Sequence, residues 1–221
     1  MAKDRYADCS HWDYEDHPQV SRLKTRCRRL EKLVRRFPKR FERYGLSTKR
    51  GHRFMFFPMV PAICPEIAGN YRGLPGSCLE DYQVMVRGDD KVGTRAAFVD
   101  IHMGLFEAHF GTTFNELEQW KSSAHPTPAP PQFLARFIPL LCLTLEEFFR
   151  IHPYANGNGH AGRLLLFVLM VRHGFDPKGL ELDESPAYGR AIHDYRRGKR
   201  RPLEDIMLKC FINGRPFSAK A

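Results

Sequence analysis

The spacing of apolar residues along the chain predicts a mostly helical protein. Between residues 22 and 41 apolar side chains recur every three or four positions, which predicts one amphipathic helix that Pro38 ends or kinks. These side chains are Leu23, Cys27, Leu30, Val34, Phe37 and Phe41. Further helices are predicted over residues 102–120, 132–151 (with a kink at Pro139), 160–174 (with Gly174 as its C-terminal cap) and 203–212.

Two other patterns interrupt the helical signal. Pro58, Pro61 and Pro65 predict a loop or short turns over residues 51–68. Two short apolar runs on either side of the turn-like stretch RGDDKVG predict the strands of a β-hairpin. The first run is Gln83, Val84, Met85 and Val86, and the second covers residues 94–101. We therefore expect a mainly α fold with one small β-hairpin.

Size and composition limit the class of protein. A chain of 221 residues and 25.6 kDa suits one globular domain with appended segments. The longest apolar run, residues 164–171, is far shorter than the roughly 20 residues that span a bilayer. The six cysteines contain no CxxC pair and the chain starts with no secretory signal, so we predict reduced thiols and a cytoplasmic protein.

The positive charge is concentrated in one segment. Residues 22–50 contain 13 basic and 2 acidic residues, a net charge of +11, whereas the whole chain carries +10. Such a segment can meet nucleic acid, an anionic membrane or an acidic protein partner. The alternative is a solvated face over a docked apolar stripe, and the absence of a groove-reading motif favours it.

The stretch HPYANGNGHAGR, residues 152–163, combines several features of a phosphate site. Its Asn-Gly pairs predict a tight turn, which leads into the predicted buried helix. Small residues such as Gly157 and Gly159 at a helix N-terminus let backbone N–H groups point at an anion, and Arg163 adds a fork of charged donors. His152 is suited to accept a proton near neutral pH.

This stretch resembles the active-site motif of the Fic (Fido) family, H-x-F-x-[DE]-[AG]-N-G-R-x-x-R. The resemblance implies a mainly helical domain that transfers part of a nucleotide, usually AMP from ATP, to a Ser, Thr or Tyr hydroxyl of a protein. It places His152 on the general base and Tyr154 on the aromatic core position. The implied nucleotide- and phosphate-binding residues are Gly157, Asn158, Gly159, His160, Gly162 and Arg163.

The resemblance extends beyond the motif. The stretch AGNYRG, residues 68–73, looks like the family's approach helix, and YQVMV with the predicted hairpin looks like the flap that clamps a substrate segment. On this interpretation Gln83, Val84, Met85 and Val86 hold the substrate. The resemblance covers about residues 65–212, so we divide the chain into an N-terminal extension, 1–50, with the basic helix, and a Fic-like domain, 51–221.

Two positions depart from the family motif. Asn156 stands where the family has its metal-binding carboxylate, and His160 stands at its first arginine. Because Mg²⁺ prefers carboxylate and phosphate oxygens, Asn156 is expected to place this cofactor only weakly. The predicted activity is transfer of AMP, or another nucleoside monophosphate, from ATP or another nucleoside triphosphate to a protein hydroxyl. The alternatives are a phosphotransferase or other group transferase, or a catalytically impaired nucleotide-binding or interaction module.

The implied partners are a nucleotide and a target protein. Many relatives carry an inhibitory [ST]-x-x-x-E-[GN] helix, but no glutamate of this chain precedes Gly or Asn. Inhibition of that kind is therefore expected from a separate, antitoxin-like protein, for which residues 22–50 are one docking surface. A second basic cluster, residues 196–201, is predicted at a helix end or loop, either gathering anionic substrate or simply solvated.

Overall fold

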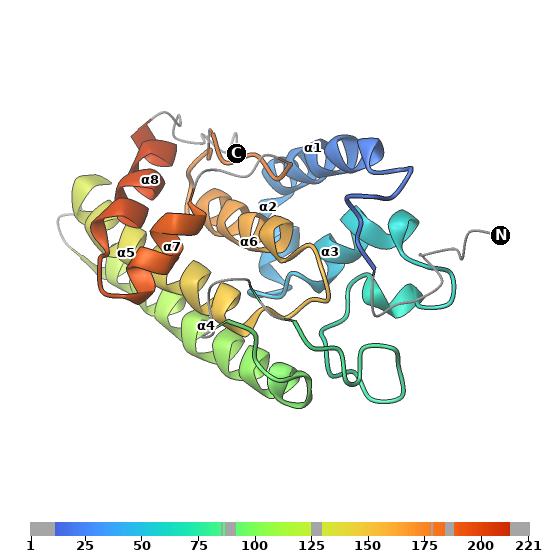
Figure 1. The fold of residues 1–221 in the computed structure, drawn as a ribbon. Coiled ribbons are helices and arrows are strands. Elements are labelled where there is room, and N and C mark those ends of the chain that lie inside the picture. The colour runs from blue at the N-terminus through green and yellow to red at the C-terminus, as the bar shows by residue number, and fades with distance from the viewer. Residues whose placement is uncertain are drawn as a thin grey trace.

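The computed structural model describes residues 12–84, 86, 92–124, 130–177, 179–183 and 188–212. Helices dominate this part of the chain (Figure 1). They are α1 (Ser21–Arg36), α2 (Pro38–Glu42), α3 (Lys49–Phe56), α4 (Val99–Ser123), α5 (Pro130–Ile151), α6 (Asn158–Arg172), α7 (Gly189–Arg196) and α8 (Arg201–Ile212). Short 3₁₀ turns cover Phe57–Met59, Pro65–Ile67 and Ala96–Phe98.

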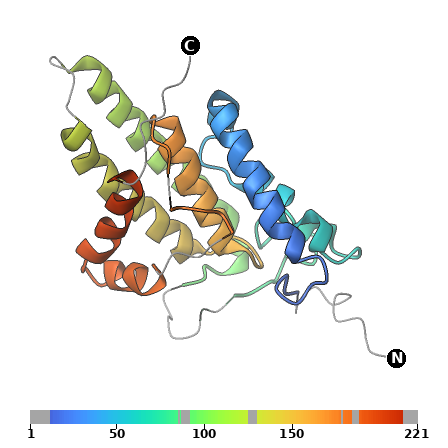
Figure 2. The same cartoon turned by 90° about the horizontal axis from the view of Figure 1, so that it is seen from above.

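The bundle is built around α6, the helix that follows the HPYANGNGHAGR loop. Nearly every residue of α6 is buried, which is typical of a helix that is apolar on all sides. It contacts α1, α2 and α3 on one side and α5 on the other. Figure 2 shows α6 between α1 and α5, with α7 and α8 beyond α5. The loop before α6 is thereby held at one end of the core.

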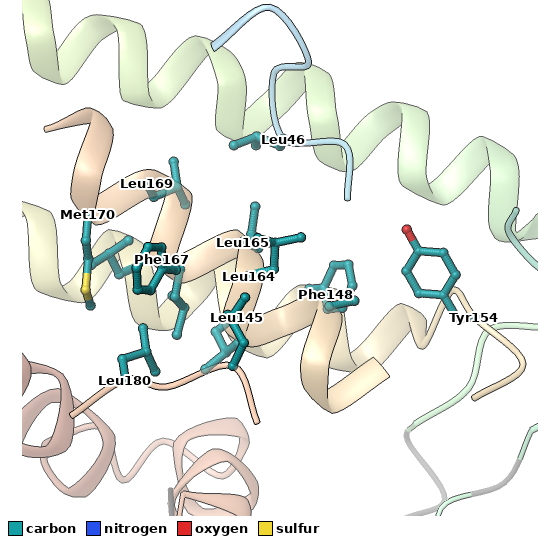
Figure 3. Packing of buried hydrophobic residues seen from close by; sticks show 14 of the residues in the cluster. Leu46, Leu145, Phe148, Tyr154, Leu164, Leu165, Phe167, Leu169, Met170 and Leu180 are labelled. Carbon is teal, nitrogen blue, oxygen red and sulfur yellow. The ribbon is translucent and has the colours of Figure 1, made fainter. Parts of the chain in front are cut away.

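The core reaches from α6 into the loop itself. Figure 3 shows Leu164, Leu165 and Phe167 of α6 packed among leucines and Phe148 of α5. The ring of Tyr154 lies beside Phe148, with 6.5 Å between the ring centroids. The motif's aromatic position therefore anchors the loop to the hydrophobic core.

Most predicted helices are confirmed, with ends that differ by a few residues. As predicted, the first helical stripe is divided at Pro38, which starts α2. Gly174 caps α6 as expected: its φ is +88°, it donates to Val171 O, and the next N–H, of Phe175, donates to Met170 O. The basic cluster at residues 196–201 runs from the last residue of α7 to the first residue of α8, which confirms its predicted position at a helix end or loop.

The prediction of loop or turns over residues 51–68 is wrong up to Phe56 and confirmed beyond it. Residues 49–56 form α3, because His52, Met55 and Phe56 share one buried face and the prolines begin only at Pro58. After α3 the chain makes the 3₁₀ turns that three prolines favour. Helix α7 was not predicted.

The predicted hairpin is not seen in the described residues, and its second strand, residues 94–101, is wrong. Met85 and residues 87–91 lie outside the described residues, but residues 96–98 form a 3₁₀ turn and α4 begins at Val99. The backbone before this turn finds its partners elsewhere: Gly93 N–H donates to Arg150 O and Thr94 N–H to Ile151 O, at the end of α5. Because α5 accepts these bonds, no partner strand is needed there.

The segment that was expected to be an approach helix, residues 68–73, is not helical. Gly69 and Gly73 have φ of +94° and +84°, a conformation that no helix continues. A Cβ on Gly73 would lie 1.9 Å from Ala96 O, so only glycine allows the two segments to approach this closely. The result is a compact turn that aims the Arg72 side chain inward.

The N-terminal part of the chain packs against the rest. The stripe of α1 is buried, and α1 contacts α3 and α6. A domain boundary near residue 50 stays a prediction. Residues on both sides of it belong to one hydrophobic core. Cys27, Cys78, Cys142 and Cys210 are free, but Cys64 is disulfide-bonded, so the prediction of reduced thiols is wrong for Cys64. Within the described ranges, no helix combines the length and hydrophobicity that a membrane span requires.

Candidate active site

His152 immediately follows α5 and has its ring oriented by that helix. Its φ is +54°, rare for a non-glycine residue, and its N–H donates to Phe148 O. Nδ1 lies 3.3 Å from Phe149 O. Because a carbonyl can only accept, this bond requires the proton on Nδ1 and leaves the lone pair on Nε2. Nε2 is therefore the nitrogen available to accept a proton.

The surroundings of His152 keep the imidazole neutral. Burial lowers its pKa to about 4, and the nearby positive charge of Arg72 lowers it too, whereas the bond to Phe149 O acts in the opposite direction. At neutral pH the ring is unprotonated, as a general base must be.

Arg72 ties the loop to its surroundings and was not identified from the sequence. It is fully buried, and burial lowers its pKa to about 10, so it stays charged at neutral pH. The guanidinium donates to four backbone carbonyls: His152 O (2.9 and 2.8 Å), Tyr82 O (3.0 Å), Thr94 O (2.9 Å) and Ile151 O (3.2 Å). The carbonyls at the end of α5 also carry the negative end of its dipole, which offsets the buried charge.

The N-terminus of α6 offers free backbone donors. Gly157 precedes the helix with φ +76°, and a Cβ at this position would lie 2.6 Å from the Phe56 ring. Among the described residues no group accepts from the N–H of Asn158 or Gly159, whereas Ala161 N–H donates to Gly157 O. Two first-turn N–H groups are thus available to an anion at the positive end of the helix dipole.

Asn158, one of the implied phosphate-binding residues, uses its side chain within the loop. It is 4% exposed, its Nδ2 donates to Tyr154 O (2.8 Å) and its Oδ1 accepts from Tyr154 N–H (2.9 Å). The amide is therefore turned into the loop, where it clamps the backbone. Its contribution to phosphate binding stays a prediction. In this structure only its backbone N–H is free to donate to an anion.

Asn156 is engaged on both sides of its amide. Oδ1 accepts from Gly157 N–H at 2.7 Å, and Nδ2 donates to Asp13 Oδ1 at 3.2 Å. Among the described residues, no three His, Cys, Asp or Glu side chains form a group that could hold a metal ion. The Asn156 oxygen is neutral and already accepts one hydrogen bond, so it is a weaker ligand for Mg²⁺ than a carboxylate, and the residues present do not form a ready magnesium site.

Asn156→Asp is expected to create that site. It places a second carboxylate beside Asp13, so without divalent ions the free energy of unfolding should fall by about 1 kcal/mol, or 2–4 °C in Tm. Millimolar Mg²⁺ should reverse the loss, since two carboxylates suit this ion. Thermal unfolding with and without Mg²⁺ measures both effects. Asn156→Ala, which loses the same hydrogen bond, is the control, and an equal response of both variants to Mg²⁺ would contradict the assignment.

His52 supports the loop from α3 and was also missed. It is fully buried and its ring stacks on Tyr154, with 3.9 Å between centroids and 6° between planes. Its Nδ1 accepts from Gly69 N–H (3.0 Å), so Nε2 carries the proton and donates to Asn156 O (2.9 Å). Tyr154 in turn shares a 2.7 Å hydrogen bond with Thr48. Nothing in the sequence around His52 indicated this position.

The remaining motif residues lie at the start of α6. Arg163 is 3% exposed, and its Nε and Nη2 both donate to Leu182 O (2.9 and 2.8 Å), so part of its fork is used internally. A Cβ on Gly159 would lie 3.3 Å from Arg163 Nη1, which places this nitrogen beside the free N–H groups. Gly162 faces α5, where a Cβ would lie 2.7 Å from Phe149.

His152 opens into a cavity of about 300 Å³ that it shares with Gly159 and Arg163. Its other walls are largely apolar: Val86, Val92, Phe149, Tyr188, Gly189, Ile192, His193 and Arg196. This volume is at the lower end for ligand pockets. A second cavity of about 470 Å³ shares Gly159 and Arg163 with the first. Together they flank the N-terminus of α6.

Residues 12–20, which precede α1, form one wall of the second cavity. Trp12 is 2% exposed and donates to Met59 O, which fixes this segment. The Tyr14 hydroxyl lies 3.5 Å from His160 Nδ1, and burial lowers the pKa of His160 to about 3. His160 is therefore neutral and brings no positive charge to the site. The other residues around this cavity are Glu15, Val20, Leu23, Lys24 and Asp183.

The predicted substrate-clamping residues are only partly placed. Val86 lines the His152 cavity, and the Gln83 side chain accepts from Ala96 N–H at 3.4 Å. Val84 lies next to Gly93, since a Cβ on Gly93 would be 2.6 Å from Val84 O. Met85 lies outside the described residues. A substrate clamp at this segment stays a prediction.

Comparison with known proteins gives partial matches to one kind of enzyme. No family model matches the chain. The chain is similar to Fic protein adenylyltransferases. Fic of Nematostella vectensis is 25% identical over 113 residues (51% of this chain and 25% of that protein), and fic-1 of Caenorhabditis elegans is 38% identical over 59 residues (27% and 12%).

The similarity to these Fic proteins is limited in extent. Fic of Drosophila melanogaster is 27% identical over 93 residues, which are 42% of this chain and 18% of that protein. The matched stretches span a quarter or less of these relatives. The Fic-like character of this chain therefore rests on this partial similarity, the helical fold and the residues around His152.

Proposed function

We propose that the chain is a Fic-like nucleotidyltransferase that moves AMP, or another nucleoside monophosphate, from a nucleoside triphosphate to a Ser, Thr or Tyr hydroxyl of a target protein. The observation that carries this proposal is the cavity that His152 shares with Gly159 and Arg163 at the N-terminus of α6. The similarity to protein adenylyltransferases supports it independently.

The chemistry follows from the placement of these groups. His152 Nε2 accepts the proton of the target hydroxyl, and the oxygen attacks the α-phosphorus. The bond from that phosphorus to the bridging oxygen breaks, and pyrophosphate leaves with the electron pair. The free N–H groups of Asn158 and Gly159 stabilise the charge on the phosphoryl oxygens, and the Arg163 guanidinium beside them adds positive charge. The apolar walls of the cavity suit a nucleobase.

Magnesium and the identity of the nucleotide remain predictions. No step above is assigned to a metal ion, because both sides of the Asn156 amide are hydrogen-bonded within the protein. ATP is the nucleotide implied by the relatives' names, and other triphosphates remain alternatives.

One observation favours a second candidate, a phosphotransferase on the same scaffold. Asn156 Oδ1 occupies the Gly157 N–H, so this donor is withheld from a bound phosphate. A triphosphate bound without this donor could present its terminal phosphorus to the hydroxyl. The two candidates predict different labels on the acceptor.

ATP labelled at either the α- or the γ-phosphate tests both. Label from the α-phosphate on a protein acceptor or on the chain itself, with release of pyrophosphate, is the expected result. Label from the γ-phosphate alone would identify a phosphotransferase. If calorimetry shows saturable nucleotide binding but neither label is transferred, the chain is a nucleotide-binding interaction module and not a transferase.

A further inference from the structure

The solvent-facing side of α1 is composed only of cations and hydroxyls. All eight exposed residues of this helix are of these two kinds: Ser21, Arg22, Lys24, Thr25, Arg28, Arg29, Lys32 and Arg36. The one acidic residue of α1, Glu31, is buried and accepts from Leu182 N–H at 2.8 Å. The exposed side of α1 therefore carries positive charge with no acid or apolar side chain among it.

Lys24 pairs with Asp183, and Arg22 donates to the neutral side chain of Gln19, which leaves four exposed cations that the described residues do not neutralise. Arg28, Arg29, Lys32 and Arg36 form no ion pair with a carboxylate in the part of the chain that the structure describes. Other cations of the helix are used internally, as in the pair of Arg35 with Asp176 at 2.9 Å. We call these four residues the α1 basic face.

The α1 basic face is accessible and regularly spaced. Figures 1 and 2 show α1 at the periphery of the bundle, with one side toward α6 and the other side open. The 16 residues of α1 make a rod about 24 Å long, and Arg28, Lys32 and Arg36 follow one another at steps of about 6 Å along it. This side of the helix lies opposite the buried stripe of Leu23, Cys27, Leu30 and Val34.

We propose that the α1 basic face binds the phosphodiester backbone of a nucleic acid. Protein interfaces concentrate their affinity on buried aromatic and apolar anchors, and the eight exposed residues of α1 include none. Phe37, directly after the helix, is exposed and lies under the guanidinium of Arg36. Arginine, which supplies three of the four cations, matches phosphate oxygens with its planar fork. Backbone binding needs only such charges. This activity goes beyond the proposed transferase and does not depend on it.

Fluorescence anisotropy of labelled oligonucleotides tests the proposal. The probes are a single-stranded RNA and a duplex DNA, each about 20 nucleotides long, which exceeds the usual site size of about 4–16 nucleotides. The full chain should bind them at about 50 mM salt and release them as salt rises. The variant with Arg28→Gln, Arg29→Gln, Lys32→Gln and Arg36→Gln should lose at least about tenfold in affinity, with a salt slope smaller by roughly 0.7–0.9 per lost contact.

A matched control separates the effect of the α1 basic face from the effect of a lower total charge. Arg197→Gln, Lys199→Gln, Arg200→Gln and Arg201→Gln remove the same charge from exposed positions between α7 and the start of α8, and should change affinity less than about threefold. All eight positions are exposed, so both variants should keep the helical circular dichroism spectrum. An equal loss in the control would overturn the proposal. No binding at about 10 μM protein, or preferred binding of polyglutamate or anionic vesicles, would overturn it too.

Discussion

Replacing Arg72 by alanine is expected to lower the free energy of unfolding by about 3–5 kcal/mol. The substitution removes the side-chain donor from the largely buried carbonyls of Tyr82, Thr94 and His152, and leaves Ile151 O with only the N–H of Thr94. An unsatisfied buried acceptor costs about 1–3 kcal/mol, and some of these carbonyls will reach water after relaxation. The melting temperature should fall by about 10 °C, which thermal or urea unfolding measures.

Two further variants test whether the loss of stability comes from the hydrogen bonds of the Arg72 guanidinium. Arg72→Lys keeps a positive charge but has no planar fork to reach four carbonyls, so an intermediate loss is expected. Arg28→Ala removes an exposed arginine and should change stability by less than about 0.5 kcal/mol. If Arg72→Ala costs no more than Arg28→Ala, the role of Arg72 as the link between α5 and the preceding segments is wrong.

His152→Ala is expected to reduce the rate of nucleotidyl transfer by at least about a hundredfold. The variant removes the nitrogen that accepts the hydroxyl proton but leaves the backbone donors of α6 and the Arg163 side chain in place. Nucleotide affinity should therefore change by less than about threefold, which separates loss of the base from loss of the site. Initial rates with labelled nucleotide and calorimetric titration measure the two quantities.

The pH dependence adds a second readout for His152. Because burial and Arg72 lower its pKa to about 4, the base is unprotonated above about pH 5. The rate constant kcat/KM should be flat from about pH 5.5 to 8 and fall only as the pH approaches 4, instead of near 6.5. His109→Ala, which changes an exposed histidine of α4 that does not line this cavity, is the control and should leave the rate within about threefold. An acid limb near pH 6.5 would contradict the assigned environment of His152.

Around the candidate site, the sequence predicted the motif residues, whereas only the structure identified the distant residues that hold them in place. The turn at Gly157, the buried helix after it and the choice of His152 as the candidate base all follow from the motif and its neighbours. Their supporting contacts come from distant segments: Arg72 reaches His152 O across 80 residues, His52 reaches Asn156 O across 104, and Asp13 reaches Asn156 Nδ2 across 143. Such contacts leave no periodic pattern in a single sequence.

By itself the sequence determined where most helices form, that Pro38 divides the first stripe, and that the positive charge lies on the exposed side of α1. These features depend on neighbours three or four residues apart, whose faces a helix brings together. Only the tertiary structure decided that residues 49–56 are helical and that residues 93–94 bond to α5 instead of a partner strand. It also decided that the Asn158 amide turns inward. In each of these three cases, buried backbone and side-chain groups had to find partners across the fold, and packing overrode the local preference.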